Sequence, residues 1–201
     1  MIRVLLADDQ ALVRGALAAL LDLETDIEVV AQVGRGDEVV DAARAADVDV
    51  CLLDIEMPGL DGIETARELA AGLPGTRSLV VTTFGRPGYL RRALEAGASG
   101  FVVKDTPAGE LAEAVRRVHA GLRVVDPSLA SESLAAGANP LTERERDVLR
   151  AALDGSPVAE IAASVHLSPG TVRNYLSSAI GKTSTSTRAQ AAQVAREHGW
   201  L

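Results

Sequence analysis

Five short apolar runs recur along the first 120 residues, and a stretch with helical spacing of apolar residues follows each of them. The runs are RVLLA (3–7), IEVVAQV (27–33), VDVCLL (48–53), SLVVTT (78–83) and GFVVK (100–104). Short continuous apolar runs are typical of strands buried on both faces. Strands that alternate with helices favour a parallel sheet covered on both sides. Residues 1–120 are therefore predicted to form a doubly wound, five-stranded α/β domain.

The next twenty residues have a different composition. Residues 121–140, GLRVVDPSLASESLAAGANP, are rich in Gly, Ala, Ser and Pro and show little periodicity. Such a composition is typical of a connecting segment. We expect a linker that carries one short helix near residues 127–136.

Only helical patterns follow, over residues 141–201. Thr142 and Glu145 have the Thr-x-x-Glu spacing of a capping box, in which each residue satisfies a backbone N–H of the first turn. Three further helix starts are expected at Ser156-Pro157, Ser168-Pro169 and Thr187. The tail is therefore predicted to be a smaller all-α domain of four helices.

Charge is unevenly distributed between these parts. The whole chain has a net charge of −8, which by itself argues against a nucleic-acid partner. Residues 1–140 hold 22 acidic against 13 basic side chains, whereas residues 141–201 hold 6 against 7. Such asymmetry indicates two domains with different partners. Aromatic residues make up only 2% of the chain, which disfavours binders that stack single-stranded bases.

Membrane and disulfide classes are disfavoured by the sequence. No apolar run approaches the roughly 18 residues that a membrane-spanning helix needs. Cys51 is the only cysteine, so no internal disulfide can form. The N-terminus turns acidic after one short apolar run and makes a poor signal peptide. We expect a cytoplasmic protein with no membrane partner.

Polar side chains stand where the predicted strands end. Asp8 and Asp9 follow the first strand, Asp54 the third, Thr82 closes the fourth, and Lys104 closes the fifth. In doubly wound sheets, ligands bind outside the carboxyl ends of the strands. If the first and third strands flank the crossover point of the sheet, these side chains converge there.

Three converging carboxylates repel one another unless a hard cation holds them together. Oxygen ligands with open positions suit Mg²⁺, which binds through a few carboxylates and a phosphate. Asp54 would then face the metal and act as a nucleophile. The Lys104 ammonium and the Thr82 hydroxyl would stabilise the charge on a transferred phosphoryl group.

Two enzyme or cofactor classes share parts of this pattern. A phosphatase of the haloacid-dehalogenase type needs a second Asp two residues after the nucleophile, where this chain has Glu56. A flavodoxin-like cofactor binder needs a phosphate loop after the first strand, where Asp8 and Asp9 would repel a phosphate. We therefore expect a regulator and not an enzyme.

Residues 1–120 resemble the receiver domains of two-component response regulators. The resemblance lies in the DD at 8–9, in LLDIEMPGLDG (52–62), in Thr82 and in FVVKD (101–105). It implies a sensor histidine kinase as partner. It also implies these roles: Asp54 as phosphoacceptor; Asp9, Asp54 and the backbone carbonyl of Glu56 as direct Mg²⁺ ligands; Asp8 acting through water; Lys104 as a phosphate contact; Thr82 and Phe101 as the switch pair.

Two positions depart from the common receiver pattern. Asp105 follows Lys104 where many receivers have Pro, and Thr83 stands where Ala or Gly is usual. A larger side chain at the second position is expected to narrow access to the acceptor.

The segment GSPVAEIAASVHLSPGTVRNYLSSAIGKT (155–183) predicts two short helices about a tight turn. Helix-turn-helix modules place the first turns of the second helix in the major groove. The residues expected to face the bases are Thr171, Arg173, Asn174 and Ser177. Lys182 and Arg188 are expected at phosphates. An ordinary helical bundle that docks a protein remains the alternative, and a gel shift on duplex DNA separates the two.

Residues 141–199 resemble the LuxR-type (GerE-like) DNA-binding domain. The resemblance lies in LTERERDVL, in VAEIAASVHLSPGTVRNYLSSAIGKT and in a final helix from Arg188. With a receiver in front, the whole chain resembles the NarL/FixJ class of transcriptional regulators. The class implies double-stranded promoter DNA as a partner.

Phosphorylation is expected to promote a homodimer through the receiver. Two surfaces are candidates for this contact. One combines the first and last receiver helices, with Leu111, Val115 and Val118; the other carries Tyr89, Arg91, Arg92 and Phe101.

Overall fold

The computed structural model describes residues 1–201 except 84–86, 128 and 132–138. The chain divides into two compact units. The α/β unit comprises Met1–Gly85 and Tyr89–Glu132, and the helical unit comprises Arg86–Gly88 and Ser133–Leu201. Each unit has a hydrophobic core of its own.

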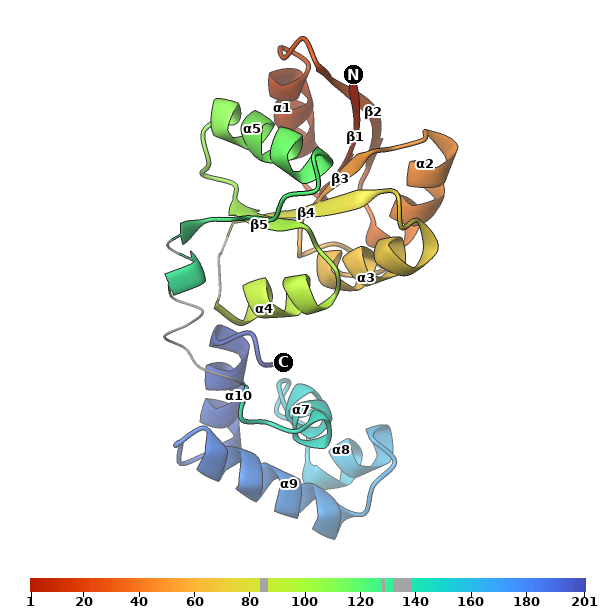
Figure 1. The fold of residues 1–201 in the computed structure, drawn as a ribbon. Helices are drawn as coiled ribbons and strands as arrows, with labels where there is room; N and C mark the ends of the chain where they lie inside the picture. Colours follow the sequence, from red (N-terminus) through yellow and green to blue (C-terminus); the bar gives the residue numbers. More distant parts are fainter. Residues whose placement is uncertain (84–86, 128, 132–138) are drawn as a thin grey trace. The chain divides into compact units, whose positions relative to one another are not determined.

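A parallel sheet forms the centre of the α/β unit (Figure 1). Its strands are β1 (Ile2–Ala7), β2 (Ile27–Val33), β3 (Val50–Leu53), β4 (Arg77–Thr82), β5 (Gly100–Val103) and β6 (Val124–Val125). Their order is β2-β1-β3-β4-β5-β6, and all described pairs are parallel. The predicted doubly wound fold is confirmed.

The prediction of five strands is wrong by one. Strand β6 lies in the segment predicted as a linker, and it pairs with Gly100 and Phe101 of β5. A strand of two residues is too short to show the alternating pattern of a strand in the sequence. It can be recognised only by its pairing with β5.

Helices cover both faces of the sheet. They are α1 (Ala11–Leu21), α2 (Val39–Ala45) after a 3₁₀ turn at Gly36–Glu38, α3 (Gly62–Gly72), α4 (Pro87–Glu95) and α5 (Ala108–His119). Helices α1 and α5 lie on one face, and α2, α3 and α4 lie on the other (Figure 1). The inner strands β1, β3, β4 and β5 therefore bury side chains on both sides, which explains their continuous apolar runs in the sequence.

The apolar residues expected at a dimer surface lie in the core instead. Leu111, Val115 and Val118 of α5 are buried against the sheet, and so is Phe101 of β5. Helix α5 presents its apolar stripe to its own sheet, and Phe101 lies within the sheet, so these four side chains cannot form the surface of a dimer contact.

The helical unit contains α7 (Glu143–Arg150), α8 (Val158–Ser164), α9 (Pro169–Lys182) and α10 (Arg188–Glu197). The capping box of α7 is present, and Ser168 and Thr187 cap α9 and α10 as predicted. The predicted cap at Ser156 is wrong, because α8 starts after Pro157 without a side-chain cap. The Ser156 N–H instead donates to Asp154.

The segment between the units is partly described. Residues 127 and 129–131 are helical, and the rest of the short helix predicted near 127–136 lies largely outside the described residues. In the described part of the chain, every helix is too short or too polar to cross a membrane.

Candidate functional site

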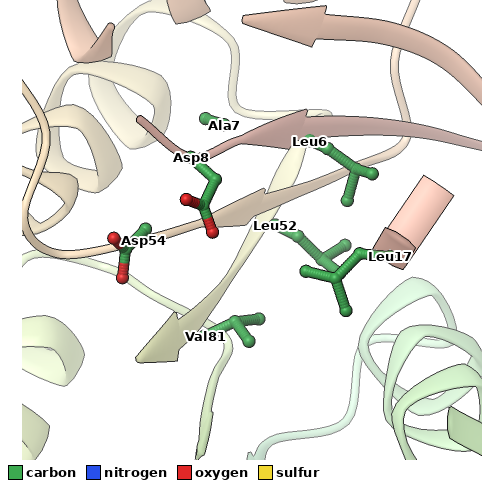
Figure 2. Close-up of a pocket in the computed structure, with 7 residues that line it drawn as sticks. All are labelled: Leu6, Ala7, Asp8, Leu17, Leu52, Asp54 and Val81. Atoms are coloured by element: carbon green, nitrogen blue, oxygen red, sulfur yellow. The ribbon is translucent and has the colours of Figure 1, made fainter. Parts of the chain in front are cut away.

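Carboxylates converge at the carboxyl ends of β1 and β3. Asp8 and Asp54 are only 3% and 5% exposed, and both line a small pocket whose other lining residues, drawn in Figure 2, are apolar. Asp9 is exposed, and one carboxylate oxygen from each of the three residues lies within 4.8 Å of the others. The structure therefore brings together the three acids predicted to converge.

Lys104 supplies a cation to this cluster. Its Nζ lies 2.7 Å from Oδ2 of Asp8 and 3.3 Å from Oδ2 of Asp54. Its backbone N–H donates to the carbonyl of Thr82 at 2.8 Å, which joins the ends of β4 and β5. One ammonium group is thus shared between two buried carboxylates.

The local electrostatics differ for the two partners. Burial raises the pKa of Asp54 to about 6, and the negative charge of Asp8 adds to this effect while Lys104 opposes it. Burial also disfavours the charged form of Lys104, but its contacts with Asp8 and Asp54 outweigh that and raise its pKa. The ammonium remains charged, while the Asp54 carboxylate is incompletely compensated.

Backbone contacts fix the positions of Asp54 and Asp8. The Asp54 N–H donates to the carbonyl of Ala7 at 2.9 Å, and the Asp8 carboxylate accepts from the Gln10 N–H at 2.9 Å. A Cβ on Gly62 would lie 2.0 Å from the Asp54 carbonyl oxygen, so only glycine allows this close approach. The turn PGLDG therefore positions the loop after β3 as well as starting α3, which Asp61 caps.

The donor set fits a divalent cation. Three carboxylates provide hard oxygen ligands within a few ångströms, and the exposed Asp9 leaves the site accessible to solvent. Mg²⁺ prefers such oxygen ligands and keeps open positions for water or phosphate. Glu56 lies exposed in the adjoining loop, and the predicted role of its carbonyl stays a prediction.

The predicted switch residues lie on one face of the sheet. In the register of β4 and β5, Val80 pairs with Phe101 and Thr82 pairs with Val103. Because side chains alternate along a strand, Thr82 and Phe101 point to the same side. Both side chains are buried, and Phe101 packs in the core beneath α4.

Helix α9 of the helical unit has one apolar and one polar face. Val172, Leu176 and Ala179 are buried. The residues predicted to contact bases lie on the polar side: Arg173, Asn174 and Ser177 are exposed, and Thr171 is partly exposed. The Thr171 hydroxyl lies 2.8 Å from that of the capping Ser168.

The two residues predicted at phosphates have partners within the protein. Arg188 donates to the carbonyls of Ser156 at 2.8 Å and Gly155 at 3.0 Å. Lys182 Nζ lies 2.7 Å from Oε2 of Glu145. Each cation therefore fixes a local contact of the helical unit.

Glu145 is a residue that the sequence identified only as part of a cap. Its side chain is buried at the end of the capping box, and it also accepts from Ser178 and Lys182. Burial would raise its pKa, but hydrogen bonds from Lys182, Ser178 and Thr142 outweigh that effect and lower the pKa to about 2. The sequence gives no sign of this role, because Ser178 and Lys182 are far from Glu145 along the chain.

Comparisons with protein families agree with both units. Residues 4–116 match the model of the response regulator receiver domain, and residues 139–195 match that of bacterial regulatory proteins of the luxR family. Among curated proteins, the chain is 44% identical over 201 residues to the transcriptional regulatory protein DesR of Bacillus subtilis (strain 168), covering 100% of both chains. It is 40% identical to the response regulator RamR of Streptomyces coelicolor over 100% of this chain and 98% of the other.

Two solved structures extend the comparison. The response regulator ChrA of a heme-sensing two-component system is 32% identical, with a TM-score of 0.60 over 100% of this chain and 98% of the other. A complex of the two-component response regulator RcsB with DNA is 24% identical, with a TM-score of 0.68 over 98% of each chain. The second likeness bears on the fold alone.

Proposed function

The chain belongs to the two-component response regulators that join a receiver domain to a LuxR-type DNA-binding domain, and from this premise we propose that Asp54 is its phosphoacceptor. One observation carries the proposal. Asp8, Asp9 and Asp54 bring carboxylate oxygens within 4.8 Å of one another beside the Lys104 ammonium. Three carboxylates so close together repel one another, and the single Lys104 ammonium compensates only part of their charge. The cluster is therefore suited to a divalent cation and a phosphoryl group.

The chemistry follows from the groups around Asp54. An Oδ of Asp54 attacks the phosphorus of a phosphohistidine on the sensor kinase, and the P–N bond breaks as the new O–P bond forms. Lys104 and the Thr82 hydroxyl donate to the phosphoryl oxygens, which carry more charge in the transition state. Asp9, Asp54 and the Glu56 carbonyl would hold Mg²⁺ directly and Asp8 would act through water; the bound ion neutralises phosphoryl charge.

The helical unit carries the output. Arg173 and Asn174 are exposed in the first half of α9, where helix-turn-helix modules read base edges. We propose that it binds double-stranded promoter DNA and that phosphorylation strengthens binding through a homodimer. Two-fold dimers match paired half-sites. The working compartment is that of the DNA, the cytoplasm, and the chain acts as a regulator rather than as a metabolic enzyme.

A duplex selection tests this output. The full chain, phosphorylated with acetyl phosphate and Mg²⁺, is expected to enrich a defined duplex from a random-sequence pool. The untreated chain and a treated Asp54→Asn variant are expected to enrich it far less. Equal enrichment by all three would contradict control by Asp54. No enrichment by any of them would favour a helical unit that docks a protein.

A further inference from the structure

Glu145 joins two helices of the helical unit through three donors. Its Oε2 accepts from the Thr142 N–H at 2.6 Å and from Lys182 Nζ at 2.7 Å, and its Oε1 accepts from the Ser178 hydroxyl at 2.6 Å. Thr142 caps α7, whereas Ser178 and Lys182 lie in the last turns of α9. One carboxylate that is 3% exposed therefore ties the start of α7 to the end of the helix expected to read DNA.

The helical period places Lys182 opposite some of the predicted base contacts and near others. With about 100° per residue, Lys182 lies about 180° around the α9 axis from Arg173 and about 140° from Ser177, but about 80° from Asn174 and about 20° from Thr171. Ser178 lies about 40° from Lys182, and both donate to Glu145. The contact with Glu145, and not the helical period, therefore ties Lys182 to α7.

We infer that Glu145 and Lys182 form a positioning pair that sets the orientation of α9 for base readout, and that Lys182 is not a phosphate contact. The inference rests on the proposed DNA-binding function. At its other end, α9 is held by Val172, which is buried in the core of the helical unit. With both ends anchored, Arg173 and Asn174 project from a helix that cannot rotate or tilt freely against α7.

The rival role for Lys182 predicts different binding behaviour. Its side chain is 34% exposed, so a phosphate could still compete for the ammonium. A phosphate contact acts on every DNA sequence and contributes about one charge to the salt dependence. A positioning pair acts only through base contacts, and the effects of removing either partner are not additive.

A double-mutant cycle on DNA binding separates the two roles. The variants are Lys182→Met, Glu145→Gln and the double variant, each in the phosphorylated full chain. Probes are a duplex that the wild-type protein selects from a random pool and a scrambled duplex, at several salt concentrations. Arg196→Met, an exposed charge change on α10, is the matched control. Trp200 fluorescence reports whether each variant is folded.

We expect each single variant to weaken binding to the selected duplex about tenfold and the double variant about tenfold, not a hundredfold. Binding to the scrambled duplex should change less than about twofold, and the salt dependence should stay that of the wild type. Lys182→Arg keeps a cation beside Glu145 and should restore most of the affinity.

Three results would overturn the inference. One is that Lys182→Met weakens both duplexes alike and flattens the salt dependence by about one charge. Another is that Lys182→Met weakens DNA binding by the same factor in the wild-type protein and in the Glu145→Gln variant. The last is no loss of affinity in either single variant. If Glu145→Gln does not fold, Lys182→Met and Lys182→Arg at two salt concentrations still decide. A wild-type protein that selects no duplex would instead contradict the proposed function.

Discussion

Asp54 of the α/β unit and Glu145 of the helical unit are both buried carboxylates beside a lysine, yet their pKa values move in opposite directions. Burial raises that of Asp54 to about 6, whereas three donors outweigh burial and lower that of Glu145 to about 2. Asp54 shares its lysine with Asp8, whose own charge repels it. Glu145 has Thr142, Ser178 and Lys182 as donors.

Burial alone does not assign a role to a carboxylate. A fully paired carboxylate stabilises the fold and has no capacity for a further ligand. An incompletely paired one remains available to a cation or to a covalent change of its charge. The α/β unit therefore has its unfavourable electrostatics at the proposed phosphoacceptor, and the helical unit uses the same chemical groups as a structural anchor.

The chain has one natural reporter in each unit. Cys51 is the only cysteine and Trp200 the only tryptophan. Cys51 lies in β3 with 0% exposure, and burial raises its thiol pKa to about 12, so it should react only when the α/β unit opens. Trp200 packs against the core of the helical unit. Thiol labelling and fluorescence thus follow the two units separately.

The largest expected effect is that of Lys104→Met. This change leaves two buried carboxylates without their ammonium, and we expect a loss of about 3 kcal/mol in the stability of the α/β unit in EDTA. Added Mg²⁺ should restore part of it. Cys51 labelling in urea measures the loss, and Lys182→Met, in the other unit, should leave that labelling unchanged. An unaltered midpoint for Lys104→Met would mean that the cluster needs no cation.

A smaller loss, of about 2–3 kcal/mol near neutral pH, is expected for Glu145→Gln. The folded pKa of Glu145 is about 2 against an ordinary 4.5. Its stabilising contribution is therefore complete above the ordinary value and is lost as pH falls toward the folded value. Urea unfolding followed by Trp200 fluorescence should show a deficit that shrinks on acidification. If the stability deficit of Glu145→Gln did not change with pH, the negative charge of Glu145 would not be its cause.

The opposite pH dependence is expected for Asp54→Asn. Because the pKa of Asp54 is raised to about 6 from 3.8, the wild-type unit loses stability as pH rises through this interval. Without metal, the variant should be more stable than the wild type by about 1–2 kcal/mol above pH ~6, and equally stable near pH ~4. Circular dichroism in urea measures this, with the exposed Asp41→Asn as control. An Asp54→Asn variant less stable than the wild type at neutral pH would contradict the opposite behaviour expected of Asp54 and Glu145.

The smallest expected effect concerns the start of α9. Ser168→Ala removes the side chain that accepts from the Thr171 N–H, which should cost about 1 kcal/mol in the helical unit. Ser168→Asp keeps an acceptor and should cost little. Trp200 fluorescence measures both. If Ser168→Ala costs more than Glu145→Gln, the Glu145 anchor is not the main polar contact of α9.

The sequence predicts the parts of this molecule that depend on position along the chain. The ends of parallel strands meet at one edge, so Asp8, Asp54 and Lys104 could be brought together from the order of the elements alone. Contacts that depend on how helices pack could not. Lys182 is 37 residues from Glu145, and only the packing of α9 on α7 joins them. Arg188 likewise donates to the carbonyls of Ser156 and Gly155, a contact that its charge alone does not predict, and its role at a phosphate stays a prediction.

Intact-mass spectrometry after treatment with acetyl phosphate tests the central contrast most directly. Wild type, Asp54→Asn and Glu145→Gln are compared with Mg²⁺ and with EDTA. We expect wild type and Glu145→Gln to gain the mass of one phosphoryl group with Mg²⁺ and none with EDTA, and Asp54→Asn to gain none in either. A full phosphoryl gain in Asp54→Asn would contradict this expectation, because the incompletely paired carboxylate would then not be the acceptor.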